Sequence, residues 1–286
     1  MPELPEVEIT KRSLTKQILH QKVSSVTIIN PKLRYNLNIE KLTLLEGKII
    51  KKITRRSKYI LIFFDDPNVL LIHLGMTGRF YFTKINDRKI NTSFYNKTDI
   101  ITKHDHLKLQ FSKFSLIYND VRKFGFIKRI HKKNVATINH LNKLGCEPLS
   151  NKFNFDYLKS KIFNKKSSIK DLLMNQNIIA GLGNIYVNET LYLCKIYPEK
   201  LGYKIRDKDI RKLVSIIKKI LKNAIIAGGS TIKNYHNSEG KTGSFQKNFK
   251  VYGREEKECL RTSCSGKIRR IIRSGRSIFY CSKCQT

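Results

Sequence analysis

The sequence predicts an α+β protein of several domains, because the type of apolar pattern changes twice along its 286 residues. The first half consists of short β-branched and aromatic runs separated by Gly, Asn and Asp, which is typical of antiparallel β structure. From about residue 137 onward, apolar residues recur at three- to four-residue spacing, as they do in helices. The last segment is short and basic and holds four of the six cysteines. We therefore expect a β domain, a helical domain and a small cysteine module, in that order.

A helix is expected first, over residues 5–20, since Pro5 suits the first helical position and Glu6 and Glu8 suit the first turn. The β runs are residues 22–29, 48–64, 68–75, 78–85, 106–120 and 125–130. So many short strands in sequence favour an antiparallel sandwich or barrel. The helical patterns cover residues 138–145, 155–163, 168–176, 185–196 and 210–229.

The charge of the chain indicates a polyanionic partner. Lys and Arg number 57 against 22 Asp and Glu, which gives a formal net charge of +35. A nucleic acid fits this balance, although A+T-rich coding also enriches a chain in Lys, Asn and Ile. No stretch has the length of a membrane span, and the acidic amino terminus does not resemble a secretory signal. Six cysteines without such a signal favour a reducing cytosol and metal binding over disulfide pairing.

The carboxy-terminal cysteines form two pairs, and sixteen residues separate the pairs. The first pair encloses four residues and the second encloses two; the pairs are Cys259 with Cys264 and Cys281 with Cys284. Two thiolate pairs at such a distance predict one structural, tetrahedral Zn²⁺ site per chain. A pair of disulfides is the alternative. Cys146 and Cys194 have no nearby cysteine in the sequence and are expected to be small buried apolar residues.

Residues 267–280 lie between the two cysteine pairs and read as a strand, a Ser274-Gly275 turn and a second strand. Such a hairpin would bring both pairs to one metal ion. It would also direct Arg273 and Arg276 outward, where arginines commonly bind phosphate.

Five further motifs extend the pattern over the whole chain: MPELPEVE at the start, RRSKYI, HLGMTGRF, DVRKFG and GLGNIY, in that order. Together with the cysteine hairpin they resemble the zinc-finger-containing formamidopyrimidine-DNA glycosylases, bacterial base excision repair enzymes for oxidised purines. The resemblance runs from residue 2 to residue 285. It implies an N-terminal β-sandwich with a helix at its start, a helix–two-turn–helix domain and a zinc-binding β-hairpin.

The resemblance and the composition together predict four segments. Residues 1–135 form the catalytic β-sandwich, 136–228 the helix–two-turn–helix domain, 229–248 a lesion-recognition loop and 249–286 the zinc-finger hairpin. The loop segment is rich in Gly, Ser, Asn and Lys, which indicates a mobile connection.

Four residues match the catalytic positions of the family. Loss of Met1 would make Pro2 the amino terminus, and its secondary amine resembles the family's nucleophile, which forms a Schiff base with the sugar. Glu3 matches the acid that protonates the sugar ring oxygen. Lys58 matches the lysine of the β-elimination step, although by itself it could be a solvated strand lysine. Arg276 matches the hairpin arginine that contacts phosphate and assists δ-elimination. Glu6 has two interpretations, as part of an ordinary helix start or as a group that shapes the site.

A glycosylase must turn its target nucleotide out of the duplex and fill the space it leaves. Met76, Arg122 and Phe124 match the family's void-filling residues, although Met76 and Phe124 would also suit a core. The DVRKFG motif departs from the commoner DPRRFG at Val121 and Lys123.

Further DNA contacts follow from the same resemblance. His104 and Lys166 align with positions that touch DNA, and His73 and Lys170 are neighbours of the same kind. Asn184 in GLGNIY would open a helix whose backbone amides face a phosphate, or it would be an ordinary N-cap.

The resemblance therefore implies a bifunctional DNA glycosylase and apurinic-site lyase that acts on 8-oxoguanine and formamidopyrimidines. Its expected partner is damaged double-stranded DNA, with no membrane, and we expect a cytoplasmic, nucleoid-associated monomer. Two alternatives remain: an endonuclease VIII-type glycosylase for oxidised pyrimidines, and a zinc-stabilised nucleic-acid-binding protein without activity. The ELPEVE start and HLGMTGRF favour the purine enzyme over the first, and the Pro2-Glu3 start favours an enzyme over the second.

Overall fold

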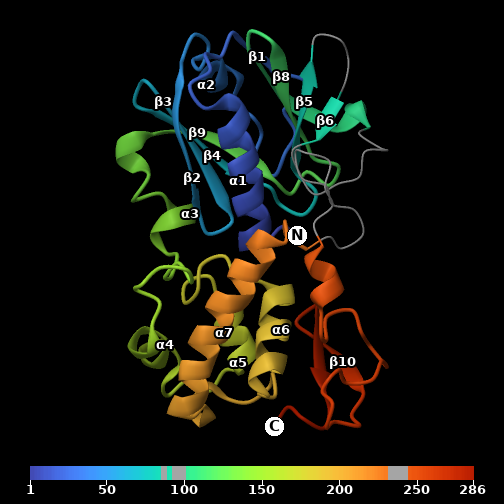
Figure 1. The fold of residues 1–286 in the computed structure, drawn as a ribbon. Helices are drawn as coiled ribbons and strands as arrows, with labels where there is room; N and C mark the ends of the chain where they lie inside the picture. The colour runs from blue at the N-terminus through green and yellow to red at the C-terminus, as the bar shows by residue number, and fades with distance from the viewer. Residues whose placement is uncertain (85–88, 92–100, 231–243) are drawn as a thin grey trace. The chain divides into compact units, whose positions relative to one another are not determined.

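The structure, a computed structural model, describes residues 1–84, 89–91, 101–230 and 244–286 (Figure 1). Its internal contacts divide the chain into two units: Met1–Asn142 with Ala227–Ser244, and Lys143–Ile226 with Phe245–Thr286. Most of the predicted recognition loop, residues 231–243, lies outside the described residues. The four predicted segments and the boundaries between them stay a prediction.

The first unit is built from two antiparallel sheets, with strand orders β1-β7-β8-β5-β6 and β2-β3-β4-β9. Its helices and 3₁₀ turns are α1 (Leu4–Ile18), α2 (Ile39–Thr43), η1 (Thr102–His104), η2 (Lys132–Asn134) and α3 (Asn139–Asn142). Its strands are β1 (Ser25–Ile28), β2 (Ile50–Arg56), β3 (Tyr59–Phe64), β4 (Asn68–His73), β5 (Arg79–Lys84), β6 (Lys89–Asn91), β7 (Asp105–Gln110), β8 (Phe114–Asn119) and β9 (Phe126–His131).

One apolar core joins both sheets to the first helix. Ile62 from the four-stranded sheet, Phe80 and Leu109 from the five-stranded sheet, and Leu14 from α1 are all buried in it. Burial of this many large side chains is the main stabilising term of such a sandwich. The predicted antiparallel β-sandwich with an N-terminal helix is thereby confirmed. The helix begins at Leu4, so Pro5 is its second residue rather than its first.

The second unit contains the helices and a separate hairpin. Its helices and 3₁₀ turns are α4 (Phe155–Ile162), α5 (Ile169–Met174), α6 (Asn184–Cys194), η3 (Gly202–Lys204), α7 (Asp207–Ile226) and η4 (Phe245–Asn248). The hairpin strands are β10 (Ile268–Arg273) and β11 (Arg276–Cys281), joined by Ser274 and Gly275 with φ angles of 48° and 70°. Two positive φ angles are what a two-residue hairpin turn requires, which confirms the predicted hairpin.

Two turns connect α5 to α6, and a single side chain braces them. Gln176 donates to the carbonyl oxygens of Met174 and Leu182 at 3.0 and 2.7 Å and accepts from the amide of Gly181 at 2.8 Å. Gly181 has a φ of 87°, which favours glycine. The predicted helix–two-turn–helix element is therefore present.

Candidate functional site

The amino terminus begins with a capping box. Glu3 is the N-cap of α1, and its amide donates to Glu6 Oε2 at 2.9 Å, while its side chain accepts from the Glu6 amide. The second oxygen of the Glu6 carboxylate accepts from both the amide and the hydroxyl of Ser230, each at 2.9 Å. The helix-start interpretation of Glu6 is therefore correct. The same side chain also holds Ser230, which lies 224 positions further along the chain. Pro2 and Glu3 are both buried at this point.

Charged groups of the first helix and of two other segments face the amino terminus. Burial lowers the pKa of the Met1 α-amine; the carboxylates of Glu3 and Glu6 oppose this, and the cations Lys58 and Arg122 add to it. Removal of Met1 would move the amine by one residue, to the buried Pro2. An amine with a lowered pKa is more often the free base at neutral pH, which is the form that attacks as a nucleophile.

Lys58 lies in the turn between β2 and β3, directly after Ser57, whose φ is 57°. Its side chain is only 6% exposed. The solvated strand lysine considered as an alternative is therefore wrong. A buried lysine beside the amino terminus is a candidate for a part in the chemistry of this site.

Three predicted DNA-contacting side chains lie on two neighbouring loops. Met76 is on the loop between β4 and β5 and is 37% exposed; Phe124, on the loop between β8 and β9, is 47% exposed. The Arg122 guanidinium lies 4.9 Å from the centre of the Phe124 ring. The alternative of core positions for Met76 and Phe124 is wrong, because buried core side chains would not be this accessible. The loops present an exposed cluster of one cation and two large apolar side chains.

His73 closes β4 at the start of the first of these loops. Its ring stacks on Phe126, with the ring centres 5.7 Å apart, and its Nδ1 accepts from the Gly75 amide at 3.1 Å. Burial, with the nearby positive charges of Lys58 and Arg34, lowers the pKa of His73 to about 4. The ring is therefore neutral at pH 7 and carries its proton on Nε2, which leaves that nitrogen as a donor. His104, in η1, is half-buried, and its carbonyl accepts from the Asp120 amide at 3.0 Å.

In the second unit, two predicted DNA-contacting residues meet on the hairpin. Asn184 Nδ2 and Lys170 Nζ both donate to the carbonyl oxygen of Ser277, at 3.0 and 3.4 Å. Burial, together with the nearby Arg276, lowers the pKa of Lys170 to about 8. The N-cap of α6 is Gly183, so the alternative that Asn184 is an ordinary N-cap is wrong. Asn184 and Lys170 therefore join the helical element to the strand that starts at Arg276. Lys166 lies apart from this cluster, exposed in the segment before α5.

The two arginines at the hairpin tip are not equivalent. Arg273 forms an ion pair with Glu199. Arg276 is exposed, and within the part of the chain that the structure describes its guanidinium makes no ion pair. Only Arg276 is therefore available to an incoming anion without first breaking an ion pair.

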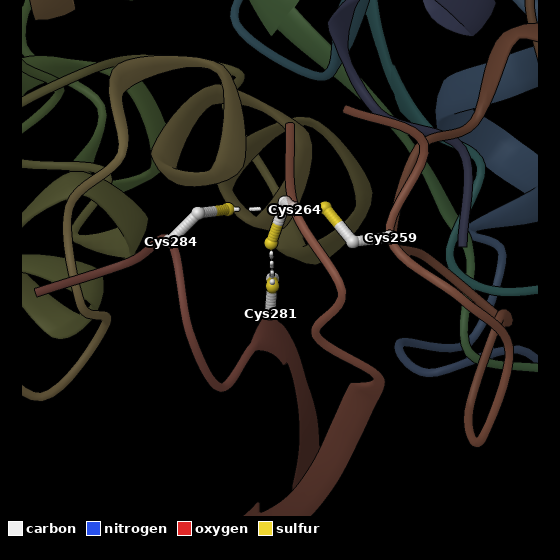
Figure 2. Close-up of side chains that lie close together, drawn as sticks. All are labelled: Cys259, Cys264, Cys281 and Cys284. Atoms are coloured by element: carbon white, nitrogen blue, oxygen red, sulfur yellow. Dashed lines mark hydrogen bonds between the residues drawn. The ribbon is translucent and has the colours of Figure 1, made fainter. Parts of the chain in front are cut away.

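The four carboxy-terminal cysteines are gathered into one cluster, and their thiols face one another (Figure 2). All four sulfur atoms lie within 4.8 Å of one another, with Cys259 and Cys284 3.8 Å apart and Cys264 and Cys281 3.6 Å apart. A disulfide would need about 2.05 Å, so this alternative is wrong. Thiolates arranged tetrahedrally at about 2.3 Å from a zinc ion would be about 3.8 Å apart. The cluster fits a metal ion.

The four-residue gap of the first pair is taken up by a turn, in which the Cys264 amide donates to the Arg261 carbonyl at 3.0 Å. The longer spacing therefore does not prevent closure of the cluster. Cys194 lies apart, and burial raises the pKa of its thiol to about 12, so it stays protonated. Cys194 is a buried apolar residue, as predicted. Cys146 is half-buried, with its sulfur 3.4 Å from the Ser150 hydroxyl.

The sequence analysis did not select Asp120 or Thr77. Asp120 is fully buried, and its carboxylate accepts from the Thr77 hydroxyl and the Gly125 amide at 2.5 and 2.8 Å. The only signal for it was its place as the first residue of DVRKFG. A short polar residue in a loop gives no indication that it is buried.

Family models match both parts of the chain. The model of the formamidopyrimidine-DNA glycosylase N-terminal domain matches residues 1–127, and the model of the formamidopyrimidine-DNA glycosylase H2TH domain matches residues 144–236.

Known proteins match along the full length. A formamidopyrimidine-DNA glycosylase of Rickettsia bellii is 41% identical over 286 residues, which is 100% of this chain and 99% of the relative. A Lactococcus lactis Fpg mutant solved with Fapy-dG-containing DNA is 36% identical, covers 100% of both chains and has a TM-score of 0.86. The wild-type Lactococcus lactis Fpg solved with oxidised-pyrimidine-containing DNA is 35% identical over 100% of both chains, with a TM-score of 0.85.

Among the helices that the structure describes, none is both long and apolar enough to cross a membrane.

Proposed function

Because the chain belongs to the formamidopyrimidine-DNA glycosylase family, whose members are DNA repair glycosylases with apurinic-site lyase activity, we propose that it excises oxidised purines from damaged duplex DNA. The proposed substrates are 8-oxoguanine and formamidopyrimidines. The observation that carries the proposal is the convergence of Glu3, Glu6, Lys58 and Arg122 on the amino terminus. We propose that the enzyme acts as a monomer in the bacterial cytoplasm, where the chromosome is.

The first step is covalent. After Met1 is removed, the Pro2 nitrogen attacks C1′ of the sugar while the bond from C1′ to the base breaks. The base leaves with the electron pair of that bond and takes up a proton. Glu3 gives a proton to the ring oxygen O4′, so that the ring opens and the nitrogen and C1′ form a cationic imine. The Pro2 nitrogen loses its own proton after it has bonded to C1′, so that its electron pair can form the double bond of the imine.

The imine then makes strand cleavage possible. It acidifies the C2′ hydrogen, whose removal expels the 3′-phosphate in β-elimination; a second elimination expels the 5′-phosphate. We assign Lys58 to the first elimination because it is buried beside the amino terminus. We assign Arg276 to the phosphate of the second because it is the exposed tip arginine without an ion pair among the described residues.

DNA is proposed to bind through both units, mainly by its phosphates, so affinity should fall with salt. The proposed phosphate contacts are His73, through its Nε2 donor, His104, Lys166, Lys170 and Asn184. Met76, Arg122 and Phe124 are proposed to fill the space left by the everted nucleotide. We propose that the four cysteines bind one Zn²⁺ ion with a structural role and no catalytic role. The ion would hold the base of the hairpin that presents Arg276.

Borohydride trapping tests the proposal. The protein with its native amino terminus would be mixed with reductant and with duplexes that carry 8-oxoguanine opposite cytosine, or an oxidised pyrimidine. We expect a covalent adduct on the purine duplex that maps to Pro2. Because a Lactococcus lactis relative was solved with oxidised-pyrimidine DNA, some adduct on the second duplex is compatible with the proposal. Trapping mainly on the pyrimidine duplex would instead favour the endonuclease VIII-type activity, and no adduct on either would favour a binding protein.

A further inference from the structure

The two loops that carry the exposed cluster occupy equivalent places in the sandwich. Residues 74–78 lead from β4 in the four-stranded sheet to β5 in the five-stranded sheet, and residues 120–125 lead back from β8 to β9. We call them the wedge loops. Their ends are adjacent because β4 pairs with β9 and β5 with β8, with His73 opposite Phe126 and Arg79 opposite Asn119. Both loops therefore cross between the sheets side by side.

The backbones of the wedge loops are in direct contact. Gly75 has a φ of 60°, and a Cβ placed on it would lie 2.4 Å from Phe124 C and Gly125 N. No side chain fits in that space. Position 75 therefore requires glycine, both for its positive φ and for the close backbone contact. This contact fixes the distance between the loops but gives no hydrogen bond between them.

The hydrogen bonds come from Asp120 and Thr77. The two oxygens of the fully buried Asp120 carboxylate accept from the Thr77 hydroxyl at 2.5 Å and from the Gly125 amide at 2.8 Å. The Thr77 oxygen in turn accepts from the Arg122 amide at 3.0 Å. The chain of bonds runs from one loop to the other and back, and it ends on the residue whose side chain lies over Phe124. Hydrogen bonds to a buried charge are about twice as strong as those between neutral groups.

Asp120 is itself held by backbone contacts. Its amide donates to the His104 carbonyl at 3.0 Å, and its carbonyl lies 3.1 Å from Nε2 of the fully buried His106. The other ring nitrogen of His106 lies 2.9 Å from the Asn30 carbonyl. The carboxylate is thus anchored to the sandwich, and the wedge loops are fastened to it.

We propose that Asp120 and Thr77 are positioning residues that make the wedge loops one rigid element, so that Met76, Arg122 and Phe124 enter the duplex together. This inference rests on the proposed function, in which these three side chains fill the space of the everted nucleotide. Neither Asp120 nor Thr77 needs to touch DNA. A preorganised wedge avoids the loss of loop entropy at the moment of insertion.

Two substitutions at position 77 test the inference, and the first of them nearly preserves the side-chain volume. Thr77→Val removes the hydroxyl, so the Asp120 carboxylate loses a hydrogen-bond donor and the Arg122 amide loses its acceptor. Thr77→Ser keeps the hydroxyl. Each protein would be tested in single-turnover excision of 8-oxoguanine from an intact duplex and from a duplex that lacks the opposite base. In the second substrate the lesion has no paired base, so less stacking must be disrupted to turn it out. No unpaired base is then left for the wedge loops to contact.

For Thr77→Val we expect about a tenfold lower rate on the intact duplex, the equivalent of one lost hydrogen bond to a charged group, and near wild-type rate on the other substrate. Thr77→Ser should match wild type on both. Equal losses on both substrates, or no loss on the intact duplex, would overturn the inference. Asp120→Asn is the second variant and should show the same selectivity, and thermal unfolding must show that each protein is folded.

A measurement of DNA unstacking, which requires no base excision, separates this inference from the proposed function. A duplex with a tetrahydrofuran abasic-site analogue and a neighbouring 2-aminopurine reports unstacking by a rise in fluorescence. Wild type and Thr77→Ser should give the full rise at saturation, and Thr77→Val a smaller one. If wild type gives the rise but no borohydride adduct, the proposed function fails and the wedge inference stands. If all three proteins give the same rise, the wedge inference fails.

Discussion

The wedge loops of the first unit and the hairpin of the second unit reach rigidity in different ways. The wedge loops are held by one buried carboxylate with hydrogen bonds at 2.5 and 2.8 Å. The hairpin is held by four thiols within 4.8 Å of one another, which fit a metal ion. The first device is built into the sandwich core and needs no partner. The second depends on a ligand that can be removed, so the two regions should respond differently to the same treatments.

The largest expected effect concerns the chemistry of the first unit. Pro2→Gly keeps an α-amine but makes it primary, and we expect imine trapping and lesion nicking to fall by at least about 10²-fold, the range of a lost catalytic group. DNA affinity should remain nearly unchanged, because binding is carried by phosphates. A gel assay measures nicking, and fluorescence anisotropy measures DNA affinity. The intact mass must first show that Met1 is absent from both proteins. Nicking at the wild-type rate would show that the secondary amine has no special part.

Metal removal should give the opposite pattern in the second unit. Chelation, or Cys281→Ser, should release the hairpin, and DNA affinity and lyase activity should fall together, by about tenfold or more, because structural zinc contributes directly to folding. Arg276→Ala should reproduce the loss of both without loss of metal. The metal content would be measured by mass spectrometry and the affinity by anisotropy. Cys194→Ala is the matched control and should retain both, since Cys194 lies outside the cluster. A fully active metal-free protein would contradict this account.

A buried carboxylate also supports the hairpin region, which sharpens the comparison. Glu189 on α6 is 2% exposed and accepts from the amides of Lys250, Val251 and Tyr252 at 2.9, 3.0 and 2.8 Å. Glu189→Gln replaces one acceptor oxygen by a donor, and we expect the free energy of unfolding of the second unit to fall by about 2 kcal/mol. Urea unfolding of the zinc-loaded protein measures this. Glu255→Gln, an exposed ion-pair residue, is the control and should change little. Equal shifts for both variants would refute the role of Glu189.

A pH dependence is also expected in the first unit. His73 has a folded-state pKa of about 4, below the ordinary 6.5, so the unfolded chain binds its proton first as the pH falls. The stabilisation from neutral His73 is therefore complete above pH 6.5 and is lost as the pH falls toward 4. Urea midpoints between pH 4.5 and 7.5 should fall more steeply for wild type than for His73→Gln. The neighbouring His140, whose pKa burial also lowers, provides the control His140→Gln, which should keep most of the wild-type slope. A His73→Gln protein with the full slope would assign the effect to other groups.

The sequence predicted the parts of the molecule whose signal is local. The cysteine pairs are visible from their spacing, and the Ser274-Gly275 turn from its residue types. The alternation of apolar residues indicated the strands because each strand has one face in a core. Burial that arises from distant segments was not visible in this way: Lys58 reads as a surface lysine in RRSKYI, yet it is 6% exposed.

Partners far apart in the sequence were the other limit. Nothing in the letters connects Glu6 to Ser230, or Thr77 to Asp120, because these contacts depend on how the chain returns to the same place. The same limit applied to Arg273 and Arg276, which look alike in sequence. Only the ion pair of Arg273 with Glu199 distinguishes them.

The crossing of the wedge loops between the sheets restricts how this part of the protein can evolve. Strand side chains alternate between faces, so one residue added to either loop would either bulge out or turn a whole strand inside out. The motif departs from the commoner pattern at Val121, which is 47% exposed, and at Lys123, which has a φ of 58°. Neither position carries the bonds to Asp120 or Thr77. We expect related chains to vary in residue type at position 121 and, among residues that tolerate a positive φ, at position 123, while the length of both loops is inherited unchanged.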